Sequence, residues 1–292
     1  MEFFQKMIKV SVIVPSYNHS DYLTERLNSI FNQTCKAIEV IILDDASTDS
    51  SVDILSEFKN HPKVTHYLIN EQNSGSPFLQ WQKGLELAKG DYIWIAESDD
   101  ACELDFLSTQ LECLAKSQAS IAVAKTLKYN NAKSSTEINH PIFKTNTSEF
   151  ITTRHLNFCP ILNISACVFI NTKKWSDRSE FLKYRLIGDR VFYQEFFKEK
   201  KVVKNEKTQS YFRKEQESVS SLKYKSLNYF QRYFKEHLKF IKFVDRTQVL
   251  TKQEFNSYLN KFFARVRDRL KKRQKLSLTY ADIYLKYFLN KK

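Results

Sequence analysis

The sequence predicts an α/β fold with a mixed, mainly parallel sheet flanked by helices, followed by a C-terminal helical extension. In the first hundred or so residues, short apolar runs alternate with segments whose apolar residues recur at a helical spacing, as in strand–helix–strand units. Several of these runs end in polar or acidic residues, which is expected where parallel strands reach a ligand-binding edge. From about residue 224 the pattern is wholly helical.

The first half of the chain alternates between the two patterns. Apolar runs predict strands over residues 10–14, ended by Pro15, and over 40–43, 64–69 and 92–96. Helically spaced apolar residues predict helices over 22–31, 52–58 and 78–88. We expect Gly90 to cap the third helix, because glycine readily adopts the left-handed conformation that ends helices. This order predicts parallel strands joined by right-handed crossovers.

The second half has a more mixed pattern. We expect a helix over 107–114, strands over 121–124 and 166–170, a helix that opens at 187–190, and short strands over 202–203 and 209–213. The polar segment 128–148 is predicted to be a loop over the strand-end edge of the sheet.

The formal net charge of +13 is unevenly distributed. Residues 1–213 contain 26 Lys and Arg against 26 Asp and Glu, whereas residues 214–292 contain 20 against 7. The whole positive excess therefore lies in the C-terminal part. This step predicts a boundary near residue 220, with one unit over 1–220 and a basic helical extension over 221–292.

The cysteines and the N-terminal segment indicate the compartment. Five cysteines, an odd number without C-x-x-C spacing, argue for a reducing environment and against a zinc site or a disulfide framework. The first residues lack the apolar run of a signal peptide, and no apolar stretch is long enough to span a membrane. We therefore expect a cytoplasmic protein.

An acidic cluster follows the predicted strand over 92–96. Glu97, Asp99 and Asp100 place three carboxylates within four residues. Such clustering is costly unless a cation neutralises it, and a divalent ion shared with a diphosphate is the natural candidate. Because alternate residues of an extended segment point to the same side, Glu97 and Asp99 could approach one ion. Taken alone, the motif could also be a solvated acidic turn.

Several motifs follow one another in an informative order. They are Val10–Asn18, Asp44–Asp49, Asn73–Gly75, Ala88–Tyr92 with Glu97–Asp100, and Gly188–Asp189 with Tyr211–Arg213. Together they resemble the motifs of family-two glycosyltransferases, which are inverting enzymes with the GT-A (Rossmann-like) fold. The resemblance covers about residues 8–220. Three positions depart from the family pattern: Glu97 replaces the usual Asp, Trp81-Gln82-Lys83 stands near the place of an Arg-Asn pair, and Glu215 replaces a frequent His.

The resemblance implies roles for particular residues. Asp44 would accept a hydrogen bond from the nucleotide base, flanked by Pro15 and Tyr17. Asp99 would be the primary ligand of Mg²⁺ or Mn²⁺, and Asp189 would be the general base. Further metal-ligand candidates are Glu97 and Asp100. The other candidates for donor binding are Asp45, Asn73, Gly75, Lys83, Glu97, Ser98 and Arg213.

Each role has a structural alternative. Asp44 and Asp45 could be turn or capping residues, and Asp189 could cap the helix that begins near residue 190. Tyr17 could simply pack. Lys83 and Arg213, proposed to pair with the diphosphate, could instead be partners in ordinary salt bridges.

The implied activity is the transfer of a hexosyl or N-acetylhexosaminyl group from a nucleotide diphosphate-sugar, expected to be a UDP-sugar, to a hydroxyl of a glycan or lipid-linked oligosaccharide. The expected setting is bacterial surface polysaccharide synthesis, such as lipopolysaccharide or capsule. A catalytically inert scaffold and a basic nucleic-acid-binding protein are alternatives. We expect no nucleic-acid partner, because the acidic edge would repel phosphates without a metal. A sugar nucleotidyltransferase is disfavoured because its glycine-rich loop is missing.

The basic extension allows two compatible readings. Leu227, Phe230, Phe234, Leu238 and Ile241 lie on one helical face, and a dense basic run spans 265–273. The extension could be a helical hairpin that packs this stripe on the catalytic unit and leaves a charged face in water. It could also attach the protein peripherally to an anionic membrane surface, on the inner face of the cytoplasmic membrane.

Overall fold

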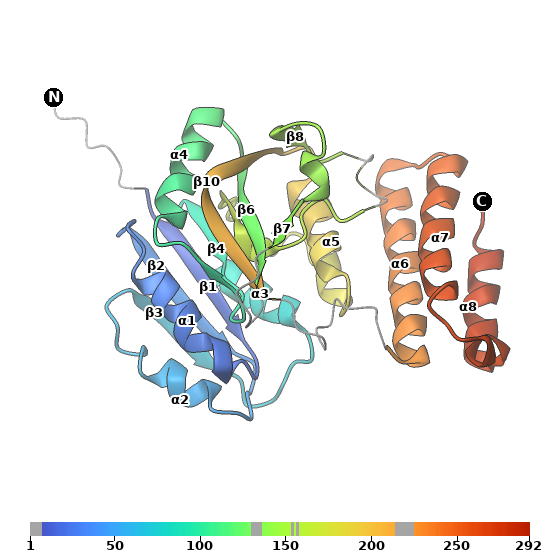
Figure 1. The fold of residues 1–292 in the computed structure, drawn as a ribbon, viewed down its shortest axis with the longest axis horizontal. Helices are drawn as coiled ribbons and strands as arrows, with labels where there is room; N and C mark the ends of the chain where they lie inside the picture. Colours follow the sequence, from blue (N-terminus) through green and yellow to red (C-terminus); the bar gives the residue numbers. More distant parts are fainter. Residues whose placement is uncertain (1–7, 130–135, 153–154, 156–157, 214–224) are drawn as a thin grey trace.

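The computed structural model describes residues 8–129, 136–152, 155, 158–213 and 225–292. Its centre is a ten-stranded sheet with the order β3-β2-β1-β4-β9-β6-β10-β5, with β7 beside β6 and β8 beside β10. The longer pairings, β1 with β2, β2 with β3 and β6 with β10, are parallel, as is β1 with β4. The pairings of β9, β7, β8 and β5 are antiparallel. The predicted mixed, mainly parallel sheet is therefore confirmed (Figure 1).

The elements of the first half follow the predicted order. They are β1 (Val10–Ser16), α1 (Ser20–Phe31), β2 (Ile38–Asp44), α2 (Ser51–Ser56), β3 (Val64–Ile69), α3 (Pro77–Leu87) and β4 (Tyr92–Ile95). The expectation that Pro15 ends the first strand is wrong, because β1 continues to Ser16 and Pro15 pairs with Leu43. Pairing with β4 stops at Ile13, so a residue without an N–H is tolerated beyond that point.

Gly90 does not cap α3. That helix ends at Leu87 with Ala88 in an extended conformation as its C-cap, and Gly90 does not have the positive φ of a glycine cap. A Cβ atom at position 90 would lie 2.7 Å from the backbone nitrogen of Ser11. Glycine is therefore required here by the close approach of two backbones rather than by helix termination.

The second half contains more strand than the pattern predicts. Its elements are β5 (Ala101–Cys102), α4 (Phe106–Ser117), β6 (Ile121–Tyr129), β7 (Thr136–Ile138), β8 (Ser148–Phe150), β9 (Cys167–Ile170), α5 (Gly188–Phe192), a short π-helix (Tyr193–Phe197) and β10 (Lys201–Arg213). Short 3₁₀ turns lie at Pro141–Phe143, Ile164–Ala166 and Glu180–Lys183.

Two expectations about this half were wrong. The segment 128–148, expected to be loop, contains the end of β6, β7 paired antiparallel with it, and the start of β8. The two short strands at 202–203 and 209–213 are one strand, β10, whose register shifts between Asn205 and Gln209. The polar residues of this irregularity interrupt the alternating pattern that would have revealed a continuous strand.

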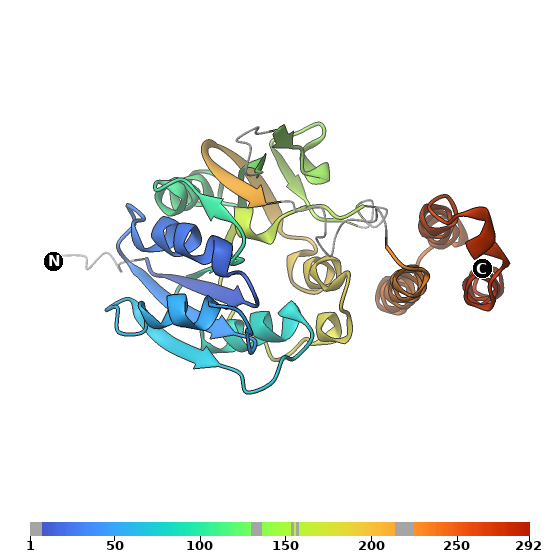
Figure 2. The same ribbon diagram turned by 60° about the horizontal axis from the view of Figure 1, so that its bottom comes forward.

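Helices cover both faces of the sheet (Figures 1 and 2). Val12 and the strand residues whose side chains point to the same face of the sheet pack against apolar side chains of α1, α2 and α4 in one core cluster. Ile13 and Ile41 face the other way and pack with α3, α5 and the C-terminal helices in a second cluster. This division follows from the alternation of side chains along a strand.

The C-terminal helices are α6 (Leu227–Gln248), α7 (Lys252–Arg267) and α8 (Leu278–Leu289), with a 3₁₀ turn at Lys272–Leu276 before α8. The predicted apolar stripe of α6 is buried at Phe230, Phe234, Leu238 and Ile241, in the same cluster as α3 and α5. The helical extension thus packs on the sheet domain as expected, but as three helices rather than a hairpin. Figure 2 shows them side by side at the end of the molecule remote from β3.

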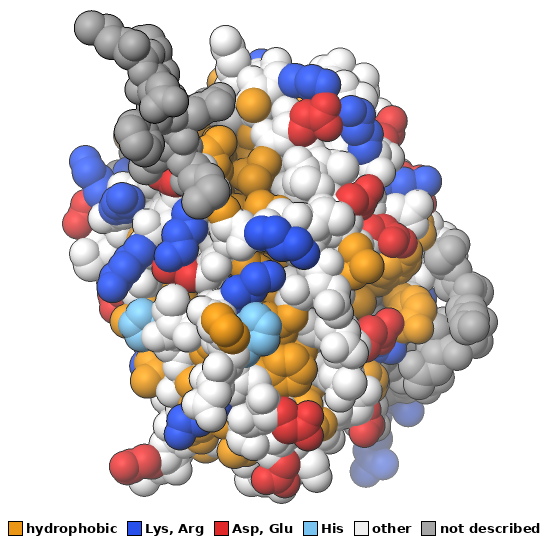
Figure 3. Space-filling model, turned by 90° about the vertical axis from the view of Figure 1, so that its left-hand side faces the viewer, with side chains coloured by type: hydrophobic (Ala, Val, Ile, Leu, Met, Phe, Trp, Pro, Cys, Tyr) orange, Lys and Arg blue, Asp and Glu red, His pale blue; other side chains and the backbone are white. Residues whose placement is uncertain are grey.

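The charges reflect the uneven composition. On the face turned away from the C-terminal helices, basic and acidic side chains are interspersed (Figure 3).

Within the part of the chain that the structure describes, none of the helices has the length and hydropathy needed to cross a bilayer.

Candidate active site

The ends of β1 and β2 are joined by hydrogen bonds between their loops. Asn18, with a left-handed φ of 52°, accepts the Thr48 N–H at 2.7 Å, and its own N–H donates to the Ser47 hydroxyl at 2.9 Å. Just before it, Tyr17 is 42% exposed, so its ring is available at this edge. Pro15 lies one residue before the end of β1, beside Leu43 of β2.

Asp44 and Asp45 are both buried but have different surroundings. Asp44 accepts the N–H and the hydroxyl of Ser47, at 2.8 and 2.6 Å, which closes a local turn. Asp45 connects β2 to distant segments. It accepts hydrogen bonds from the Asn70 side chain, from the N–H and hydroxyl of Ser74, and from the Gln80 side chain. The turn role weighed as an alternative is therefore present at Asp44, whereas Asp45 holds distant segments together. Base recognition by Asp44 stays a prediction.

The loop after β3 lies against the segment that precedes α5. Asn73 donates from its amide to the Asp45 carbonyl at 3.1 Å and accepts the Gly75 N–H at 2.7 Å. Gly75 has a φ of +72°, and a Cβ there would lie 3.3 Å from the Arg185 guanidinium. Glycine is favoured here both by its backbone conformation and by its contact with Arg185.

The acidic cluster forms a turn. The Asp100 N–H donates to the Glu97 carbonyl at 3.2 Å, so the segment is not extended and the argument from alternating side chains is wrong. Glu97 accepts the Trp81 indole N–H at 2.6 Å, whereas Asp100 accepts the Arg213 backbone N–H at 3.1 Å. Ser98 is buried and its hydroxyl lies 2.7 Å from His19 Nδ1.

Burial makes the charged forms of these acids costly. It raises the pKa of Glu97 to about 8 and of Asp100 to about 7, and the nearby Asp99 carboxylate adds to both shifts. Burial also raises the pKa of Asp99. The cluster is therefore short of positive charge in the absence of a bound cation.

Arg26 of α1 supplies part of that charge. It is fully buried, stacks 4.8 Å from the Trp94 ring centroid, and donates from Nε to the Glu97 carbonyl at 3.0 Å. Among the described residues, its Nη1 and Nη2 atoms have no hydrogen-bond partner. Its positive charge opposes the rise in pKa of Glu97, Asp99 and Asp100 without cancelling it. Sequence reasoning missed this role, although an arginine within the apolar stripe of 22–31 was a usable signal.

The acidic turn fits a divalent cation that a ligand would help to hold. Within the described ranges, no three His, Cys, Asp or Glu side chains are grouped so that they could hold a metal by themselves. Mg²⁺ commonly binds to one or two carboxylates and completes its shell with water and substrate phosphates. The hard oxygen donors at Glu97, Asp99 and Asp100, whose charged forms lack compensation, match that mode of binding.

Helix α3 contacts each part of the candidate site. Gln80 reaches Asp45, Trp81 reaches Glu97, and the Phe78 ring fills the space where a side chain at Gly188 would project. The sequence suggested only Lys83 from this helix. Its ammonium group donates to the Asn70 side chain at 3.1 Å, and its contact with a diphosphate stays a prediction.

Asp189 lies in the first turn of α5. Its Oδ1 accepts the Arg190 N–H at 2.7 Å, and the Cys159 thiol lies 3.8 Å from its Oδ2. Burial raises the pKa of Asp189. Burial raises the pKa of the nearby Tyr193, and the negative charges of Asp189 and Glu97 add to that rise.

The family model for "Glycosyl transferase family 2" matches residues 11–178, which is more than half of the chain. This chain belongs to glycosyltransferase family 2. The predicted family assignment is thereby confirmed, and the motifs at 10–18, 44–49, 73–75 and 88–100 all fall within or at the edge of the matched region.

Named relatives agree with this family. The chain is 36% identical over 125 residues to glycosyltransferase GlyA of Streptococcus pneumoniae, a match over 43% of this chain and 18% of GlyA. It is 38% identical over 96 residues to the poly(ribitol-phosphate) beta-N-acetylglucosaminyltransferase TarS of Staphylococcus aureus, over 32% of this chain and 17% of TarS. The matches thus span less than a fifth of the length of either relative.

Solved structures show the same fold. The crystal structure of S. aureus TarS 1–349 in complex with UDP-GlcNAc superposes with a TM-score of 0.61 at 18% identity, covering 96% of this chain and 89% of that one. The mannosyltransferase PcManGT from Pyrobaculum calidifontis, in complex with GDP-Man and Mn²⁺, gives a TM-score of 0.54 at 13% identity, covering 98% and 86%. The expected GT-A fold is confirmed.

In this family-two chain, Arg213 is surrounded by protein groups. It is buried, forms an ion pair with Glu25 at 2.6 Å, and its guanidinium lies 4.3 and 4.7 Å from the ring centroids of Tyr22 and Tyr129. The salt-bridge alternative is therefore present, and a diphosphate contact by Arg213 stays a prediction. Glu215, the departure noted from the family pattern, lies outside the described residues.

Helix α6 contacts the segment that leads into the helix of Asp189. The Glu236 carboxylate of α6 accepts the backbone N–H groups of Arg185, Leu186 and Ile187, at 3.1, 2.9 and 3.3 Å. The segment 185–187 leads directly into α5, so an acid that lies 49 residues beyond Ile187 in the chain fixes the entry to the helix that carries Asp189. Sequence patterns gave no sign of this contact.

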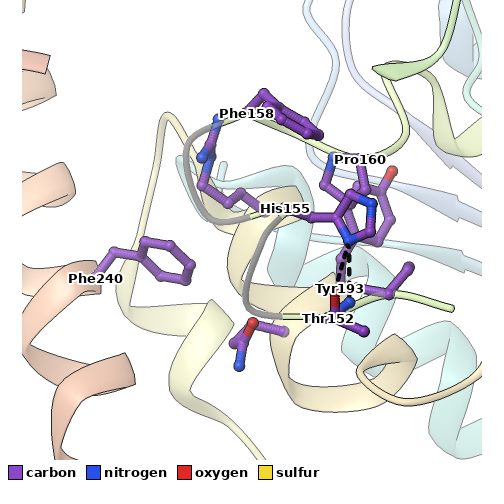
Figure 4. Close-up of a pocket in the computed structure, with 9 residues that line it drawn as sticks. Thr152, His155, Phe158, Pro160, Tyr193 and Phe240 are labelled. Atoms are coloured by element: carbon purple, nitrogen blue, oxygen red, sulfur yellow. Dashed lines mark hydrogen bonds between the residues drawn. The ribbon is translucent and has the colours of Figure 1, made fainter. Parts of the chain in front are cut away.

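A small hollow opens at the same junction (Figure 4). Phe240 of α6 faces it from one side, and the Thr152 N–H donates to His155 Nδ1 at 3.0 Å on the other. The hollow is lined by Ile151, Thr152, His155, Phe158, Pro160, Arg190, Tyr193, Gln194 and Phe240. None of the predicted site residues lines it.

Proposed function

We propose that this chain transfers a hexosyl or N-acetylhexosaminyl group from a UDP-sugar to a hydroxyl of a glycan or lipid-linked oligosaccharide, with inversion, in the synthesis of a bacterial surface polysaccharide such as capsule or lipopolysaccharide. Residues 1–220 would form the catalytic unit and 221–292 the helical extension. The observation that carries the proposal is the acidic turn at 97–100, at the carboxyl end of β4 and beside the ends of β1 and β2 in a family-two chain.

Two neighbours support the choice of donor and cofactor. TarS was solved with UDP-GlcNAc, and PcManGT was solved with GDP-Man and Mn²⁺. In this chain, Asp99 would be the main ligand of Mg²⁺ or Mn²⁺, with Glu97 and Asp100 as further ligands. Such an ion would stabilise the negative charge of the leaving diphosphate.

The remaining donor contacts would come from the strand-end loops. Asp44 would accept the base N–H, with Pro15 and Tyr17 beside the base, because a buried acceptor strongly disfavours a base that lacks the matching donor. Asp45 would act mainly by holding the loop. The other donor-site candidates are Asn73, Gly75, Lys83, Ser98 and Arg213.

Asp189 would act as general base. The acceptor oxygen attacks the anomeric carbon, the bond from that carbon to the diphosphate oxygen breaks, and the acceptor proton passes to the Asp189 carboxylate. Burial raises the pKa of Asp189, which brings its basicity closer to that needed near neutral pH. The nearby Cys159 thiol and the Arg190 N–H help to orient the carboxylate.

The first test is a thermal-shift screen of UDP, GDP and ADP, each with and without MnCl₂ or MgCl₂. We expect the largest stabilisation from UDP with metal, because a ligand that binds the folded state raises its apparent stability. Stabilisation by none of the nucleotides would argue against a nucleotide-sugar site and favour an inert relative.

The second test is Asp189→Asn. With a donor and acceptor that support turnover by the unmodified protein, we expect kcat to fall by roughly 10²–10⁴-fold while UDP still stabilises the variant. Asp53→Asn is the matched control, because Asp53 is also a first-turn acid but belongs to α2 rather than α5. Turnover by Asp189→Asn equal to that of the control would remove Asp189 from the role.

A further inference from the structure

An exposed apolar face on α8 is separate from the candidate active site. Fifteen large hydrophobic residues of the described chain are exposed, and six of them lie between residues 276 and 289. They are Leu276 (88% exposed), Leu278 (90%), Tyr284 (51%), Leu285 (55%), Phe288 (62%) and Leu289 (68%). The other nine are spread over residues 8–249. A cluster of this kind, unlike scattered exposed residues, indicates an interaction surface.

The geometry of α8 separates this face from its packed face. Ile283 is fully buried, and the Tyr287 ring stacks on Phe263 at a centroid distance of 4.0 Å. At 100° per residue, the exposed apolar positions 278–289 span an arc of about 140° on another side of the helix. Of these residues, Tyr284 lies at the border of the packed face, with its ring edge-on to Phe263 at a centroid distance of 6.0 Å. Leu278, Leu285, Phe288 and Leu289 lie further from that face and are more exposed.

Basic side chains adjoin the apolar face. Lys271, Lys272 and Arg273 are exposed at the turn that leads into Leu276 and Leu278. In the described part of the extension, no carboxylate forms an ion pair with these three side chains. An apolar stripe beside exposed basic residues is typical of helices that lie at the surface of an anionic bilayer.

We propose that α8, with the turn at 271–276, docks on an anionic membrane surface by inserting its exposed apolar side chains among the lipids. Charge complementarity favours this partner, because residues 214–292 hold the whole net excess of basic residues. A second copy of the chain fits less well. A symmetric contact through this face would bring two basic clusters together. This proposal does not depend on the proposed reaction.

The test is co-sedimentation of the full chain with vesicles of phosphatidylcholine alone or with about 30 mol% phosphatidylglycerol. We expect binding to the anionic vesicles that weakens as salt rises. Replacing Lys271, Lys272 and Arg273 together by Gln should lower the partition coefficient by about a hundredfold, since each basic residue contributes several-fold. Equal binding to both vesicle types, or no binding to either, would overturn the proposal.

A matched pair of variants separates insertion from simple charge attraction. Leu285→Gln with Phe288→Gln should weaken binding by about tenfold or more. Leu104→Gln with Phe150→Gln, which changes the same residue types at exposed sites elsewhere, should leave it unchanged. Circular dichroism checks the fold of all variants. Equal binding by both double variants would contradict the proposal.

Two further measurements address insertion and self-association directly. In Phe288→Trp, the new indole should shift its emission to shorter wavelength on anionic vesicles and be quenched by brominated lipids. The three native tryptophans are buried and give a steady background. If sedimentation velocity without lipid showed a dimer that Leu285→Gln with Phe288→Gln dissociates, the face would be a contact between copies and the membrane proposal would be wrong.

Discussion

Replacing Glu236, which belongs to the helical extension, should change the position of Asp189 in the sheet domain. Glu236→Ala removes the acceptor of three backbone N–H groups, and the one on Ile187 belongs to a buried residue. A hydrogen bond to a charged group contributes about 1.5–3 kcal/mol to stability, and an exposed N–H that loses its acceptor can form a hydrogen bond with water instead. Because Arg185 is exposed, we expect a total loss of about 3 kcal/mol in the free energy of unfolding, measured by urea denaturation.

The same substitution should lower activity more than donor binding. The freed segment leads into Asp189, and a displacement of about 1 Å in a catalytic group can cost roughly 10²-fold in rate. We therefore expect kcat to fall by about 10–100-fold at a temperature where the variant remains folded, with little change in the KM for the donor. Steady-state kinetics over several donor concentrations separates the two parameters.

Two variants complete this experiment. Glu236→Gln keeps one carbonyl oxygen and should give intermediate losses of stability and of kcat. Asp268→Ala changes an exposed acid of the same extension, whose partner is Arg267, and should leave both quantities near those of the unmodified chain. A folded Glu236→Ala protein with unchanged kcat would refute the inference that α6 positions Asp189.

Three other changes have defined outcomes. Burial lowers the pKa of His140 to about 4 from an ordinary 6.5. Between these two pH values, the unfolded state therefore binds more protons than the folded state. The free energy of unfolding has its full value above pH 6.5 and falls by about 3 kcal/mol as the pH is lowered to 4. His140→Gln should reduce that fall, seen as a smaller pH dependence of the urea midpoint. Gly188→Ala places a Cβ 2.4 Å from the Phe78 ring and should cost about 1–3 kcal/mol or more of stability, together with activity. Trp81→Phe removes the N–H that Glu97 accepts at 2.6 Å, and chemical denaturation should show a loss of about 1–3 kcal/mol.

Local sequence patterns were enough to predict the order of strands and helices in the first hundred residues. Apolar runs and helical periodicity are local properties, and the strands at 38–44 and 64–69 lie where those patterns placed them. Because parallel strands end at a common edge, the sequence also predicted that the loops after β1, β2 and β4 lie together. The uneven charge, which is a matter of composition, likewise needed no structure.

Which polar groups of the site contact one another became known only from the folded chain. The contact of Glu236 with the segment 185–187, and the place of Arg26 beneath the acidic turn, join residues far apart in the chain. The same holds for Trp81 and Glu97, which come from different elements. A periodic pattern indicates which side of a helix is buried, but it does not indicate the neighbour against which that side packs. The hydrogen bonds and charges of the site depend on that neighbour, because burial is what makes an unpaired polar group costly.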